Sequence, residues 1–143
     1  SEKGDYQLSA DLEEKARASF WAGAASDEET EKQILKTYER FGYVLDPHTA
    51  VAMHVYEQYS QQHPEEPTII VSTASPYKFP HTVLAALGER GAKDEFDLLA
   101  KLQAKIKLPL PKGLKELANL PIRHHRAIDP AQMGTTVREL LEV

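Results

Sequence analysis

Hydroxyl and lysine side chains gather between residues 72 and 78, directly after a short apolar run. The β-branched composition of residues 68–72, bounded by a proline on either side, predicts a buried strand. Ligands in open α/β sheets collect beyond the carboxyl ends of strands, so Thr73, Ser75 and Lys78 lie where a ligand site is expected. The alternative is an ordinary strand-to-helix loop, since most such loops do no chemistry.

A second polar group opens the helix that is expected from Pro47. Asp46 suits the N-cap of that helix, and Pro47 suits its first position, where the missing N–H costs nothing. His48 and Thr49 follow within the first turn. Taken alone, this pattern indicates a capped helix start and nothing more.

Other common catalytic and metal-binding patterns are absent from the sequence. No two of the six histidines stand at i, i+4 with a supporting glutamate, so we expect no metal site. The sequence contains no Gly-x-Gly-x-x-Gly, P-loop or Gly-x-Ser-x-Gly motif. It also has no cysteine, which excludes disulfides, thiol nucleophiles and thiolate metal ligands.

Length and charge limit the class of protein. The 143 residues, 41% hydrophobic and 27% charged, suit one globular domain with a real core. The net charge of −5 argues against a nucleic acid or an anionic membrane as partner, and the apolar runs are too short to span a bilayer. The first residue is Ser1, which is compatible with processing, a cloning remnant or a start inside a longer protein.

The periodicity predicts a helix-rich α/β fold. We expect a helix after Ser9, a strongly capped one over 27–41 and a largely buried one from Pro47. Four more are expected over 81–87, from Asp94 to 105, over 112–119 and after residue 130. Besides the strand at 68–72, there are two weaker candidate strands, residues 43–45 and the region near Ile122. Two or three strands make a poor sheet, so we expect residues outside this chain to complete it.

Two stretches together resemble the threonine synthase family. Residues 42–52 read Gly-Tyr-Val-Leu-Asp-Pro-His-Thr-Ala-Val-Ala, similar to the family signature GY-x-x-DPHTAVA. Residues 72–80 read Ser-Thr-Ala-Ser-Pro-Tyr-Lys-Phe-Pro, similar to the family segment STAHPAKF, with Ser75 in place of His and Tyr77 in place of Ala. The runs 29–43 and 110–121 and the closing helix fit as well, so the resemblance covers nearly the whole chain.

The resemblance implies the C-terminal part of a fold-type II enzyme that depends on pyridoxal phosphate (PLP). Such an enzyme is a phospho-lyase that converts O-phospho-L-homoserine and water to L-threonine and phosphate, in threonine biosynthesis. The resemblance also implies a cytoplasmic protein whose single domain, 1–143, pairs with the N-terminal catalytic portion. Residues 1–5 are polar and are expected to be frayed, and the net charge and short apolar runs favour no nucleic acid or membrane partner. The family's Schiff-base lysine motif and glycine-rich loop are absent, so we assign no catalytic residue and expect this chain alone to be inactive.

The resemblance also gives candidate site residues. Thr73 corresponds to the hydroxyl that hydrogen-bonds the pyridine nitrogen of PLP in the family. The candidate pocket-lining residues are Asp46, His48, Thr49, Ser72, Ser75 and Lys78. For the first three a purely structural role is an equal alternative, and Lys78 belongs to a different motif from the Schiff-base lysine.

Two other functions remain open. One is a related PLP enzyme such as threonine dehydratase, which carries an EP-small-small segment in place of residues 46–49. The other is a non-catalytic binding module descended from such a domain. A large exposed apolar patch beside Thr73 would favour part of a larger enzyme, whereas a polar face would favour an independent module.

Overall fold

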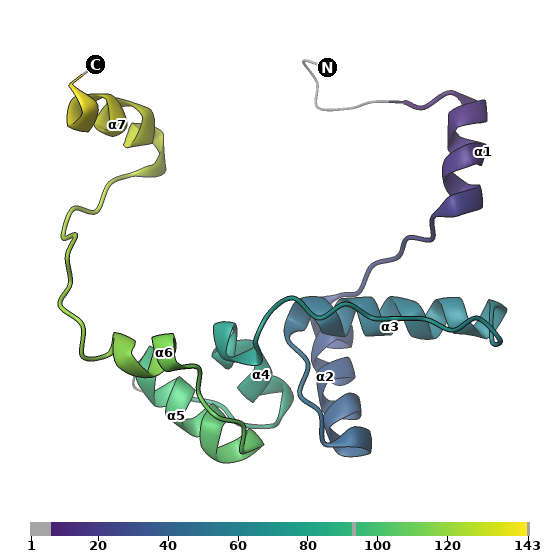
Figure 1. Cartoon of the computed structure of the whole chain (residues 1–143), viewed down its shortest axis with the longest axis horizontal. Coiled ribbons are helices and arrows are strands. Elements are labelled where there is room, and N and C mark those ends of the chain that lie inside the picture. The colour runs from purple at the N-terminus through teal and green to yellow at the C-terminus, as the bar shows by residue number, and fades with distance from the viewer. Residues whose placement is uncertain (1–6, 93, 143) are drawn as a thin grey trace. The chain divides into compact units, whose positions relative to one another are not determined.

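A computed structural model describes residues 7–92 and 94–142, so the predicted fraying of residues 1–5 lies outside the described residues. The chain divides into two compact units, Ser1–Leu110 and Pro111–Val143, and the single-domain assignment stays a prediction. All regular structure within the described residues is helical (Figure 1), which confirms the helix-rich fold class.

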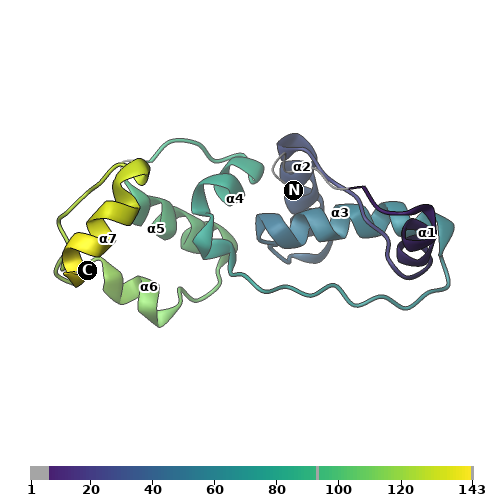
Figure 2. The same cartoon turned by 90° about the horizontal axis from the view of Figure 1, so that it is seen from above.

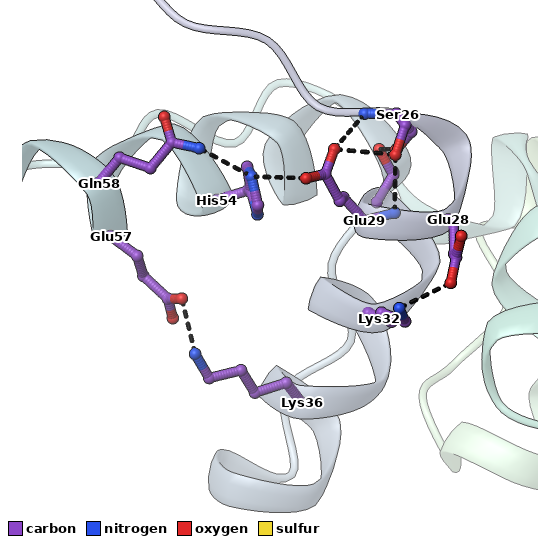
Figure 3. Close-up of polar contacts among 9 residues, drawn as sticks. Ser26, Glu28, Glu29, Lys32, Lys36, His54, Glu57 and Gln58 are labelled. Carbon is purple, nitrogen blue, oxygen red and sulfur yellow. Dashed lines mark hydrogen bonds and ion pairs between the residues drawn. The ribbon is translucent and has the colours of Figure 1, made fainter.

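The first two helices of unit Ser1–Leu110 differ in their capping hydrogen bonds and in burial. Helix α1 (Ala10–Ser19) buries no residue, and Ser9 makes no side-chain cap hydrogen bond. Helix α2 (Asp27–Phe41) has the predicted bounds and the predicted capping box. The Glu29 carboxylate accepts from the Ser26 backbone N–H at 2.8 Å, and the Ser26 hydroxyl accepts from the Glu29 N–H at 3.3 Å (Figure 3). Gly42, with φ of +66°, ends the helix.

Helix α3 (Pro47–Gln62) packs against α2, and polar pairs join the two (Figures 1 and 3). Lys36 Nζ lies 2.6 Å from a Glu57 carboxylate oxygen, and His54 Nε2 lies 3.8 Å from Glu29. The prediction that α3 is largely buried is wrong. Among its residues only Thr49 and Ala50 are buried, because α2 covers one face and leaves much of the apolar remainder half-exposed.

The core of this unit forms where α4 (Pro80–Ala86) packs on α2 and on α5 (Glu95–Ile106), as Figure 2 shows from above. Its fully or almost fully buried side chains include Ile34, Val83, Leu84 and Leu102. As predicted, Asp94 caps α5 by accepting from the Asp97 N–H at 2.9 Å. A short 3-10 helix, η1 (Pro76–Lys78), precedes α4.

The expected strand at 68–72 does not form within the part of the chain that the structure describes. Ile69 is 90% exposed and Val71 is 71% exposed, so this apolar segment lies largely outside the core. A strand is defined by hydrogen bonds to a neighbouring strand, and no described segment supplies one. For the same reason residues 43–45 and the region of Ile122 form no strand, although Val44 and Leu45 are buried.

The unit Pro111–Val143 contains α6 (Lys112–Leu117), the 3-10 helix η2 (Pro130–Gln132) and α7 (Met133–Leu141). Asp129 opens η2 by accepting from the Ala131 N–H at 2.8 Å. Arg126 pairs with Glu139 at 3.1 Å. Thr136 is the only buried residue in the described part of this unit, so these helices share little core of their own.

Candidate functional site

Asp46 is the buried centre of the polar residues at the start of α3. Its side chain is 1% exposed, and Oδ1 accepts from the backbone N–H groups of His48 at 3.0 Å and Thr49 at 3.4 Å. The Thr49 hydroxyl donates a short hydrogen bond to Oδ2. Burial raises the Asp46 pKa, but the hydrogen bonds from Thr49 and His48 together outweigh burial and bring that pKa below its usual value. Asp46 is therefore a carboxylate at neutral pH.

The His48 imidazole is held on two sides although it lies at the surface. Its Nδ1 lies 3.1 Å from Asp46 Oδ1, and its ring centroid lies 4.9 Å from that of Phe79. An ionised carboxylate can only accept, so Nδ1 carries the proton and donates it. In the neutral ring Nε2 then has the free lone pair, and the side chain is 71% exposed.

A hydroxyl pair connects this helix start to the loop 72–79. Thr49 Oγ1 and Ser72 Oγ lie 3.2 Å apart. A hydroxyl has a single proton, and Thr49 gives its proton to Asp46, so Ser72 is the donor in this contact. The two segments that resemble the family are thus joined through side chains, which the sequence spacing alone did not establish.

Within the loop, Ser75 and Tyr77 make hydrogen bonds with backbone groups. The Ser75 hydroxyl accepts from the Tyr77 N–H at 3.3 Å and its carbonyl accepts from the Lys78 N–H at 3.0 Å, which forms η1. Tyr77 is 3% exposed, and its hydroxyl donates to the Leu108 carbonyl at 2.6 Å. Burial also raises the Tyr77 pKa. Tyr77 and Phe79 were missed as site residues, and two aromatic residues between Pro76 and Pro80 were the available signal.

Thr73 and Lys78 remain available for other contacts. Both residues are exposed, and neither side chain makes a hydrogen bond or ion pair with another described residue. Of the predicted site residues, the structure connects Asp46, His48, Thr49 and Ser72 directly. Ser75 serves the loop itself.

His48 also lines a groove of about 970 Å³ within unit Ser1–Leu110. One wall is an α3 face that includes Val51, Val55 and Tyr59, and the facing walls are segments 17–23 and 66–71. Across residues 7–92 and 94–142, no three His, Asp or Glu side chains are grouped as metal ligands. No helix in that same range has the length and apolar character needed to cross a bilayer.

Comparison with known proteins identifies relatives over most of the chain. The profile of a family described as "Threonine synthase, C-terminal" matches residues 49–136. Threonine synthase of Escherichia coli is 34% identical over 119 residues, which are 80% of this chain and 23% of that protein. Threonine synthase of Serratia marcescens is 30% identical over 128 residues, which are 86% of this chain and 25% of that protein. Mouse threonine synthase-like 1 is 42% identical over 77 residues, 54% of this chain and 10% of the relative. The chain thus spans about a quarter of the two bacterial relatives.

Proposed function

The chain belongs to the threonine synthase family, and from that membership we propose that it forms the C-terminal portion of a PLP-dependent threonine synthase. The proposed reaction converts O-phospho-L-homoserine and water to L-threonine and phosphate. The observation that carries the proposal is the contact between Thr49 and Ser72, at 3.2 Å. It joins the two segments whose sequences resemble the family, in one polar network built on the buried Asp46.

The residues of the loop suit the proposed cofactor. The exposed Thr73 hydroxyl has no partner among the described residues, so it is free to hydrogen-bond the pyridine nitrogen of PLP. When bound, PLP supplies an electron sink for the reacting carbon atoms. A hydroxyl does not hold the ring nitrogen protonated as a carboxylate does, so Thr73 moderates that electron demand. Asp46, His48, Thr49 and Ser72 form the adjoining wall, and Lys78 is not assigned the Schiff base.

We assign the N-terminal catalytic portion of the same enzyme as the partner of this chain. Ile69 and Val71 are exposed just before Thr73, as expected if a neighbouring strand normally covers this apolar segment. The incompletely covered α3 supports the same arrangement. This apolar surface beside Thr73 favours part of a larger enzyme over an independent binding module. The chain alone is then inactive, and its cytoplasmic location stays a prediction.

The test uses the natural gene product, translated from its own start codon. We expect a mass well above 16.0 kDa, a visible absorption band of a PLP–lysine aldimine and release of phosphate from O-phospho-L-homoserine. Ammonia release from threonine would instead identify a threonine dehydratase. A colourless product of about this chain's mass would support the binding module, and turnover by the 143-residue chain with PLP would contradict the predicted inactivity.

A further inference from the structure

The orientation of the His48 ring is fixed by two contacts, although the side chain is exposed. An exposed histidine ordinarily needs no fixed partner, yet this ring has a buried carboxylate at Nδ1 and the Phe79 ring beside it. The carboxylate is itself held by Thr49 and by two backbone N–H groups, so it cannot follow a moving ring. The result is an imidazole with a defined tautomer and an exposed Nε2 lone pair, which is the arrangement of an oriented general base.

We infer that His48 is an acid–base residue of the proposed reaction, accepting at Nε2 a proton from the water molecule that is added to the substrate. The inference rests on the proposed function. It assigns a role in proton transfer to a residue that resemblance to the family placed only as a candidate pocket lining.

The position of the imidazole supports this role. Asp46, which orients the ring, is connected through Thr49 to Ser72, the residue that precedes Thr73. Phe79, which contacts the ring, closes the same loop at its other end. His48 thus contacts one end of the loop directly, at Phe79, and is connected to the other end through Asp46 and Thr49. It also lines the 970 Å³ groove, whose other lining residues come from α3 and from segments 17–23 and 66–71 and do not include Thr73.

The chemistry of the proposed reaction needs such a group. The hydroxyl of water ends on a carbon of the product, so water must lose a proton as its oxygen forms the C–O bond. The C–O bond to phosphate breaks at the terminal carbon of the side chain, whereas the new C–O bond forms at the neighbouring carbon. One hydrogen therefore moves from that neighbouring carbon to the terminal carbon, which becomes the methyl group of L-threonine, and the released phosphate takes up the proton that water loses. A neutral His48 that accepts the proton at Nε2 and returns it to phosphate leaves no net proton on the protein. Positioned acid–base groups of this kind contribute about 10²–10⁴-fold in rate.

His63 offers a matched control. Its Nδ1 also lies 3.1 Å from a carboxylate, that of Glu66, and its ring stacks on Tyr59 with a centroid distance of 4.3 Å. Unlike Asp46, the Glu66 side chain is 56% exposed, and neither His63 nor Glu66 makes a hydrogen bond to the loop 72–79. His63 therefore shares the local pairing of His48 but not its connection to Thr73.

The first arm of the experiment measures turnover of O-phospho-L-homoserine by the natural gene product and its variants. We expect His48→Ala to lower kcat by about 100-fold or more, with KM changed less than about threefold. Added imidazole should restore at least about tenfold of the lost kcat, whereas His63→Ala should stay within about threefold of wild type. A kcat loss below about tenfold, an absence of imidazole rescue, or an equal loss in His63→Ala would overturn the inference while leaving the proposed function intact. An inactive wild-type gene product would overturn both.

The second arm needs neither cofactor nor turnover. Nitrogen NMR of the 143-residue chain, above the pH at which histidines titrate, should show the proton of His48 on Nδ1 and the lone pair on Nε2. His124, whose ring has no partner among the described residues, serves as the internal reference for an unconstrained imidazole. A proton on Nε2 of His48, or a tautomer mixture equal to that of His124, would show that Asp46 does not orient the ring and would overturn the inference.

Discussion

Removing the Asp46 carboxylate should destabilise the chain more than the loss of an ordinary helix cap. In Asp46→Ala, the N–H groups of His48 and Thr49 lose their N-cap acceptor, which costs about 1–2 kcal/mol. The buried Thr49 hydroxyl also loses its acceptor, which adds about 1–2 kcal/mol. The expected decrease in the free energy of unfolding is therefore about 2–4 kcal/mol at pH 7.

The contribution of the Asp46 carboxylate to stability should also have a predictable pH dependence. The pKa of Asp46 is lower in the folded chain than in the unfolded one, where the pKa of an aspartate is about 4. A group with a lowered folded pKa contributes stability that is present above its unfolded pKa and is lost as the pH falls through its folded pKa. The stability difference between wild type and Asp46→Asn, which cannot ionise, should therefore be largest at neutral pH and shrink below about pH 4.

Urea unfolding followed by circular dichroism measures both effects, with a constant m-value as the check that the unfolded state is unchanged. Asp94→Ala is the matched control. Asp94 caps α5 through one hydrogen bond at 2.9 Å but is exposed, so its loss should cost only about 0.5–1 kcal/mol. A cost for Asp46→Ala no larger than that of Asp94→Ala, or an Asp46→Asn deficit that does not change with pH, would refute this account of the buried carboxylate.

Three further predictions concern the loop and the segment before it. Thr73→Val in the natural gene product should lower turnover sharply while the circular dichroism spectrum stays unchanged, and unaltered turnover would refute the proposed contact with the ring nitrogen. Tyr77→Phe should lower the free energy of unfolding by about 1–2 kcal/mol, because the Leu108 carbonyl loses its donor. Tyr43→Phe, at an exposed position, should cost less than about 0.5 kcal/mol. Equal costs would show that the hydrogen bond from Tyr77 to Leu108 does not stabilise the fold. Ile69→Ser should change the free energy of unfolding of the 143-residue chain by no more than about 0.5 kcal/mol, since Ile69 is already exposed. In the natural gene product the same substitution should lower it by about 2 kcal/mol or more. The absence of that difference would argue against a covering strand.

The parts of the fold that were predictable are those that neighbouring residues decide. The bounds of α2 follow from Ser26 and Glu29 at one end and Gly42 at the other, within a few residues of the helix they limit. The start of α3 follows in the same way from Asp46 and Pro47. Such hydrogen bonds depend on local spacing, which the sequence states directly.

The parts that were not predictable depend on distant residues. The run 68–72 has the composition of a strand, but strand formation requires a partner that composition cannot supply. The contact between Tyr77 and Leu108 joins residues 31 positions apart, and nothing in either local sequence indicates it. The ring contact between His48 and Phe79 brings together the first turn of α3 and the N-cap of α4, which are distant in the sequence. The connections that orient these side chains were therefore not predictable, and the assignment of the site residues stays a prediction.

The residue types at 46–50 can be explained one by one from the network that they form. Asp46 must be an ionised acceptor because four groups of His48 and Thr49 donate to it, and Pro47 gives up an N–H that a first helical turn does not use. Thr49 needs a hydroxyl, which alone can donate to Asp46 and accept from Ser72. Ala50 is 0% exposed, so a larger side chain would have to displace the surrounding core. The His48 ring contacts Asp46 and Phe79, but its side chain is 71% exposed and its Nε2 makes no hydrogen bond to a described residue, so a functional role best explains this residue type.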